Sequence, residues 1–96
     1  MDTYKQVVEA AESALIKGEY NVCIEFLYPI IETYPPSSKE GVNLRNIIIT
    51  ALSGINKKEE AKNFCKELLK SHDYKVRENA KYLMEIIDSP EIKKPE

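Results

Sequence analysis

Residues 18–35, GEYNVCIEFLYPIIETYP, constrain the fold of this chain more than any other segment. The segment opens on a Gly-x-Tyr turn, because Gly18 can take the left-handed conformation at a helix end without steric cost. Apolar side chains then recur at intervals of three and four, which is the spacing of one buried helix face: Tyr20, Cys23, Ile24, Leu27, Ile30 and Ile31. Pro35 and Pro36 forbid continuation. The segment predicts the second helix of a helix–turn–helix unit, over residues 20–33, with a kink or irregular turn at Pro29.

The same periodicity, read with helix caps, predicts four more helices, over residues 3–17, 38–53, 57–71 and 74–88. Thr3 with Gln6 and Ser37 with Glu40 have capping-box spacing, and Ser38 is a second candidate cap. Asn46–Thr50 has strand propensity, so a strand is the competing interpretation of that run. Because the turns are short, we expect neighbouring helices to be antiparallel. The predicted fold class is all-α, with five helices.

Length and composition indicate one small packed domain. The chain has 96 residues, of which 43% are hydrophobic and 31% charged, with a net charge of −2. This lack of a basic field disfavours general nucleic-acid binding. No apolar run approaches the ~20 residues of a membrane span, and the N-terminus lacks the pattern of a signal peptide. We expect a cytoplasmic domain over residues 1–88 and an extended, proline-containing tail over residues 89–96.

No residue pattern indicates catalysis, a cofactor or a metal. Cys23 and Cys65 are expected to be reduced, buried thiols, with a disulfide or a reactive thiol as the alternative. His72, the only histidine, is expected to lie in a solvent-facing turn, and it forms no zinc shell with Cys65. The three glycines are too scattered for a phosphate-binding loop. The chain is therefore expected not to be an enzyme.

The two halves of the chain share a pattern, in which Cys23 and Ala61 are equivalent. This pattern resembles the tetratricopeptide repeat, a helix–turn–helix unit of ~34 residues. In the first half the signature positions fall on Ala11, Gly18, Tyr20, Cys23, Leu27, Ile30 and Pro35. In the second half they fall on Ile49, Asn56, Lys58, Ala61, Cys65, Leu68 and Asp73. The resemblance implies an α-solenoid of two units, with residues 74–88 as a terminal capping helix.

A narrower resemblance concerns the later half of the chain. It is similar to short cyanobacterial and plastid tetratricopeptide-like proteins at Tyr34–Ser38, Thr50–Leu52, Glu60-Ala61 with Cys65, Asp88–Pro90 and Lys94–Glu96. This resemblance implies a lineage more than a role; the role that we expect beside it is in the assembly of a larger complex, such as a photosynthetic one. A membrane complex would then be reached through a partner.

In this repeat class the first helix of each pair lines a concave face that binds a peptide or a helix. The resemblance therefore places partner-binding residues at Glu12, Asn46, Thr50, Arg77 and Lys81, together with Val8 and Ile16. Arg77 and Lys81 lie one turn apart and could hold a carboxylate, or could instead pair with Glu78 or Glu85. The family's chaperone-tail clamp is not expected, because its lysine and asparagine positions fall on Val8, Glu12 and Ile47.

The leading hypothesis is thus a protein-interaction scaffold with a groove lined by the first, third and fifth helices. The alternative is a structural subunit that associates with its own copy, for example as a homodimer. Val8, Leu15 and Ile16 favour that alternative, because they form an apolar strip beside the core-facing stripe of the first helix.

Overall fold

The computed structural model describes residues 3–89, which form five α-helices. They are α1 (Thr3–Ile16), α2 (Tyr20–Ile31), α3 (Lys39–Gly54), α4 (Lys58–Leu69) and α5 (Tyr74–Asp88). The all-helical prediction is confirmed for this part of the chain. The run Asn46–Thr50 lies inside α3, so the strand interpretation is wrong. Residues 90–96 of the predicted tail lie outside the described residues.

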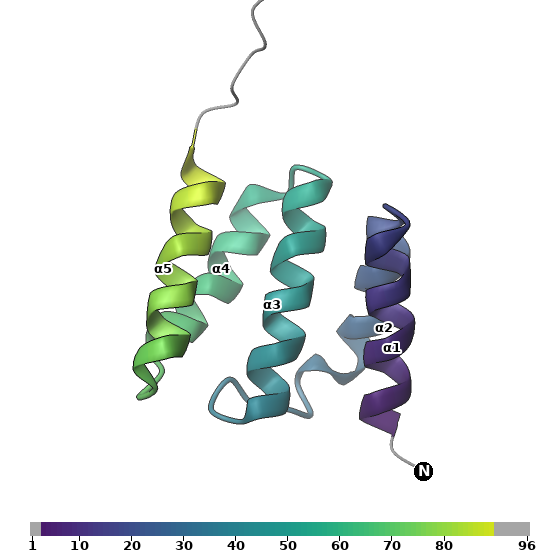
Figure 1. The fold of residues 1–96 in the computed structure, drawn as a ribbon, viewed down its shortest axis with the longest axis horizontal. Helices are drawn as coiled ribbons and strands as arrows, with labels where there is room; N and C mark the ends of the chain where they lie inside the picture. Colours follow the sequence, from purple (N-terminus) through teal and green to yellow (C-terminus); the bar gives the residue numbers. More distant parts are fainter. Residues whose placement is uncertain (1–2, 90–96) are drawn as a thin grey trace, which may run out of the picture.

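Each helix packs against the next helix along the chain, and α1 also packs against α3. Figure 1 shows α1, α3 and α5 in front, with α2 and α4 behind them. The first, third and fifth helices therefore share one layer, and the two remaining helices share the other. This order gives α3 neighbours on both sides and from behind, which leaves it only a narrow strip of free surface.

The core is centred on α3, which is buried from Leu44 to Leu52 except at Asn46 and Thr50. Side chains from all five helices join one hydrophobic cluster. Its largest fully buried side chains are Leu27, Leu44, Ile48, Ile49, Leu52, Leu68, Cys23 and Cys65. Removing this apolar surface from water is the main favourable term in folding. Both cysteines are free and buried, as predicted. Burial raises the pKa of the Cys23 and Cys65 thiols, and the Asp88 charge raises that of Cys65 further.

The turn between α1 and α2 is repeated between α3 and α4, 38 residues later. Gly18 and Asn56 both take the left-handed conformation, with φ of 77° and 63°. The residues after them, Glu19 and Lys57, have nearly the same φ and ψ, −85° and 68° against −90° and 67°. The Glu19 amide donates to the Ala14 carbonyl at 2.9 Å, and the Lys57 amide donates to the Leu52 carbonyl, also at 2.9 Å. The two turns therefore have the same conformation, although only one of them contains glycine at this position.

Every helix except α5 differs from prediction at one or both ends. Helix α1 ends one residue early, at Ile16, and helices α3 and α4 each begin one residue late, at Lys39 and Lys58. Helices α2 and α4 end two residues early, at Ile31 and Leu69, because each chain then tightens into a turn. The Thr33 amide donates to the Ile30 carbonyl at 3.1 Å, and the Ser71 amide donates to the Leu68 carbonyl at 3.1 Å. Helix α3 includes Gly54, where an added Cβ would lie 2.7 Å from the Tyr20 ring. Gly54 thus gives Tyr20 room to pack, while Asn56 reverses the chain.

The turn between α2 and α3 is closed by Ser38, the N-cap of α3. Its hydroxyl accepts from the Gly41 amide at 2.9 Å and donates to the Pro35 carbonyl at 2.8 Å. A Cβ on Gly41 would lie 1.8 Å from the same Pro35 oxygen. The cap is therefore Ser38 and not Ser37, and only glycine fits at position 41. Helix α2 runs through Pro29 and ends two residues after it.

Candidate partner-binding surface

A strip of small polar side chains forms the free surface of α3. Asn43, Asn46, Thr50 and Ser53 recur at intervals of three and four, so they lie on one helix face. Asn43 and Asn46 are half-buried, and Thr50 and Ser53 are exposed. The two hydroxyls donate to carbonyls of their own helix, Thr50 to Asn46 at 3.0 Å and Ser53 to Ile49 at 2.8 Å. We call these four residues the α3 strip.

The α3 strip lies between α1 and α5, because side chains of both helices bond to it. The Asn43 amide donates to the Tyr4 hydroxyl of α1 at 2.8 Å. The Asn79 amide of α5 donates to the Asn46 side-chain oxygen at 3.3 Å. The Tyr4 ring also packs against the Tyr34 ring, with centroids 5.2 Å apart. The strip is therefore flanked by the two outer helices of the front layer.

Three of the predicted site residues belong to this surface. Asn46 and Thr50 are members of the α3 strip, and Glu12 is exposed on α1. Tyr4, Val8 and Glu12 follow each other at intervals of four, so they form one row along α1. Tyr4 bonds to α3 near the start of this row, and Glu12 lies about two turns further along it.

Arg77 and Lys81 lie on the other side of α5. Each is two residues from Asn79, which is about 200° around a helix, and Asn79 is the residue that bonds to α3. Lys81 instead pairs with Glu78 of its own helix at 3.0 Å, in line with the alternative interpretation. Arg77 donates to the Ser71 carbonyl at 2.9 Å, and its guanidinium lies 5.9 Å from the centre of the Tyr74 ring. The structure therefore does not bring these two residues together with Glu12, Asn46 and Thr50.

That far side of α5 also holds the helix to α4. The Lys62 ammonium lies 2.5 Å from the Asp88 carboxylate and 3.6 Å from that of Glu59. The hydrogen bond with Asp88 is the main reason why the pKa of Lys62 is raised. Lys81 and Asp88 are seven residues apart, two helical turns, and so lie on the same face of α5. Asp88, on this face, therefore joins α5 to α4, while Lys81 remains exposed.

Large apolar side chains are exposed toward the C-terminal ends of α1 and α5. Ile16 is 86% exposed, and Tyr82 and Ile86 are 62% and 50% exposed. Ile86 and Asn79 lie on one face of α5, since they are seven residues apart. Val8 and Leu15, by contrast, pack against the core and are only half-exposed. Of the apolar strip predicted on the first helix, Ile16 alone is therefore left to solvent.

Sequence reasoning missed Asn43 and Asn79, the two residues that tie the strip to its neighbours. A signal for Asn43 was present, because it has the same spacing from Asn46 as Thr50 has from Ser53. Asn79 carried no comparable signal, since its role depends on where α5 packs.

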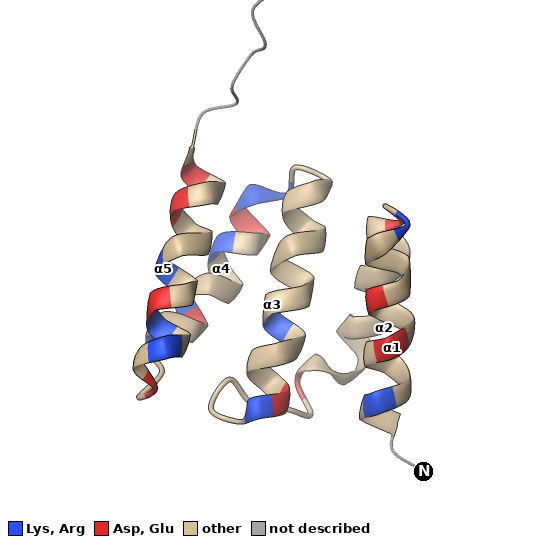
Figure 2. Cartoon of the chain, viewed as in Figure 1, with Lys and Arg blue, Asp and Glu red and all other residues tan. Residues whose placement is uncertain are grey.

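Helix α3 carries few charged residues, as Figure 2 shows. They are Lys39, Glu40 and Arg45.

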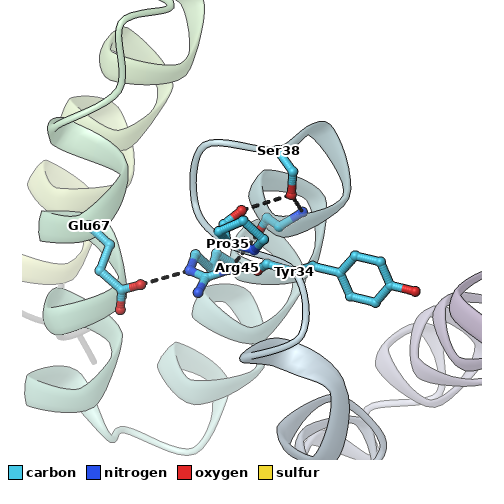
Figure 3. Close-up of polar contacts among 6 residues, drawn as sticks. Tyr34, Pro35, Ser38, Arg45 and Glu67 are labelled. Carbon is cyan, nitrogen blue, oxygen red and sulfur yellow. Dashed lines mark hydrogen bonds and ion pairs between the residues drawn. The ribbon is translucent and has the colours of Figure 1, made fainter.

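Arg45 is a buried cation that joins the α2–α3 turn to α4. Its side chain is 5% exposed, and its Nε donates to Glu67 at 2.8 Å. Its Nη1 donates to the Tyr34 carbonyl at 2.8 Å and to the Gly41 carbonyl at 3.1 Å. Figure 3 shows Arg45 between Glu67 on one side and the Tyr34–Ser38 turn on the other. This cluster fixes the turn against α4 through partners that lie far apart in the sequence.

Metal sites, membrane-spanning helices and similarity to known proteins give no further indication of function in the described residues. Within residues 3–89, no three histidine, cysteine, aspartate or glutamate side chains gather closely enough to hold a metal ion. None of the described helices has the length and apolarity needed to cross a membrane. Comparison with protein-family models, curated proteins and solved structures found no match for the chain.

Proposed function

We propose that this protein is a protein-interaction scaffold that binds a peptide or a helix on the surface formed by α1, α3 and α5. The observation that carries the proposal is the α3 strip. A central helix whose free side chains are small, uncharged and hydrogen-bonding offers a partner close approach and polar contacts at little desolvation cost. Glu12, Asn46 and Thr50 are its predicted contact residues.

We further propose that the fold is a short α-solenoid of the tetratricopeptide type, with antiparallel hairpins α1–α2 and α3–α4 and with α5 as a cap. The repeated turn supports this, because Gly18 and Asn56 occupy the same signature position in the two repeat units. The aligned pairs Ala11 and Ile49, Cys23 and Ala61, and Leu27 and Cys65 are all at most 1% exposed, as a repeated packing unit requires.

In this mechanism the strip recognises the partner's backbone, and its borders recognise side chains. An asparagine amide donates and accepts at once, so it can pair with a peptide group of an extended chain. Tyr82 and Ile86 supply exposed apolar area to anchor a side chain, a use for which tyrosine is favoured. Catalysis has no part in this proposal. The lineage implied by the sequence resemblance suggests a cytoplasmic protein whose partner is a subunit of a larger assembly.

A panned library of random peptides tests the proposal. We expect the enriched peptides to bind wild-type protein and to bind Thr50→Arg at least about tenfold more weakly, because the arginine fills the strip. Thr50 is exposed and bonds only to its own helix, so the variant should fold. Asn63→Arg, at an exposed position on α4, places the same side chain in the rear layer.

The outcomes separate clearly. If the enriched peptides bind Asn63→Arg as tightly as wild type but bind Thr50→Arg more weakly, the result supports the proposed surface. A double variant, Arg77→Glu with Lys81→Glu, should bind like wild type, because these residues lie on the far side of α5. Enriched peptides that bind Thr50→Arg as well as wild type would show that the surface is wrong.

Self-association is the second candidate function, and the exposed apolar side chains Ile16, Tyr82 and Ile86 favour it. They could be covered by a second copy. Light scattering at micromolar concentration tests this, with Tyr82→Ser as the variant. A wild-type protein that stays monomeric over the accessible concentration range would exclude it.

A further inference from the structure

An open hollow of about 570 Å³ lies between two turns, away from the α3 strip. Pro36 and Ser37 of the α2–α3 turn form one wall. The other wall comes from the end of α4 and the α4–α5 turn, with Glu67, Lys70, His72 and Asp73 among its residues. Most of the lining surface is carbon. A volume of this size lies within the range of small-ligand pockets, so it suits one or two side chains of a partner.

The hollow is preformed, because its two walls are tied together. The Arg45 guanidinium bonds to Tyr34 and Gly41 at the α2–α3 turn and to Glu67 on α4, as Figure 3 shows. Pro36 has a fixed φ, and Ser38 closes the turn beside it. On the other wall, Arg77 holds the Ser71 carbonyl. A ligand entering the hollow would therefore cost little ordering of the protein.

The lining carries two carboxylates and one lysine, so an anion would be held by individual donors that have no partner and not by a net positive charge. Both carboxylates in its lining are engaged, Glu67 by Arg45 at 2.8 Å and Asp73 by the Lys75 amide at 2.9 Å. Lys70 and His72 are exposed, and their side chains make no hydrogen bond or ion pair within residues 3–89. The hollow thus presents free donors over an apolar lining.

We propose that this hollow binds an acidic peptide segment in which a carboxylate adjoins an apolar side chain. The apolar side chain occupies the carbon-lined space, and the carboxylate pairs with the Lys70 ammonium at the rim, assisted by the His72 ring. This site is independent of the α3 strip. It shares no residue with that surface, so either site can fail without the other.

Amide NMR spectra of isotope-labelled protein test the proposal with N-acetyl-leucine as the probe. We expect millimolar N-acetyl-leucine to shift the resonances of residues 36–37 and 67–73 in a saturable way. N-acetyl-leucinamide, which has the same side chain and no charge, should bind about tenfold more weakly, and acetate should bind about as weakly because it lacks the side chain.

Lys70→Glu should weaken the binding of N-acetyl-leucine about tenfold. Lys66→Glu, four residues earlier on α4 and also exposed, should leave it unchanged. Equal shifts from the amide, equal shifts in Lys70→Glu, or equal binding of inorganic phosphate would overturn the proposal, as would the absence of shifts in these residues. Thr50→Arg should not affect this titration, which keeps the two proposed sites distinguishable.

Discussion

The buried guanidinium of Arg45 makes Glu67→Gln the most informative single substitution in this protein. Arg45 is 5% exposed and cannot lose its proton, so its charge must be balanced where it lies. Glu67 supplies the only carboxylate that bonds to it in the described residues. Glutamine keeps the shape and one acceptor oxygen but removes the negative charge. The substitution therefore isolates the value of the charge.

The size of the effect follows from burial on the two sides of the pair. Breaking a buried pair by removing one charge costs about 3–5 kcal/mol, whereas an exposed pair contributes about 0–1 kcal/mol. Glu67 is 39% exposed, so water screens the pair from its side. We expect Glu67→Gln to lower the free energy of unfolding by about 2 kcal/mol, an intermediate value. For a domain of this length that corresponds to a melting temperature about 10 °C lower.

Urea unfolding followed by far-UV circular dichroism measures this loss. Glu59→Gln is the matched control, because Glu59 lies on the same helix and is 88% exposed. We expect that control to stay within about 0.5 kcal/mol of wild type. A cycle with Arg45→Met and the double variant should give a coupling energy of about 1–2 kcal/mol, since Glu67→Gln no longer strands a buried charge once Arg45 is gone.

Two results would refute this reasoning. If Glu67→Gln is as stable as Glu59→Gln, Arg45 does not need its carboxylate. If the effects of Arg45→Met and Glu67→Gln simply add, the two side chains do not act as a pair.

Three further predictions concern the packing of the chain. Gly41→Ala should lower the free energy of unfolding by about 3 kcal/mol or more, because its Cβ would overlap the Pro35 carbonyl; urea unfolding beside the exposed control Glu40→Ala measures this, and equal stability would contradict it. Cys23 and Cys65 should react with a thiol reagent only on unfolding, since both are buried with raised pKa values. Stability should fall as the pH rises through the ordinary thiol value of 9.0, because the unfolded chain then loses protons that the folded chain retains. Fast labelling of native protein, or unchanged stability there, would exclude this.

The local elements of the fold were predictable because their causes are local. Periodicity and caps predicted α5 at its observed bounds, and the proline pair ended α2 close to its observed end. The equivalence of Gly18 and Asn56 was also readable, although Asn56 is not glycine, because asparagine tolerates the left-handed conformation. The spacing of apolar residues did not predict where α2 and α4 end. In both helices the chain tightens into a turn before the apolar pattern stops.

By itself, then, the sequence determined the helices, the two matching turns and the buried stripe of each helix, since these depend on residues three or four apart. Only the tertiary structure decided which polar residues meet. It buried Arg45 beside Glu67 and opened a hollow next to them, and it joined Asn46 to Asn79. It also turned Arg77 and Lys81 away from the surface on which the repeat resemblance placed them. Those outcomes depend on how one helix is rotated against another, and that rotation is set by the packing of the whole core.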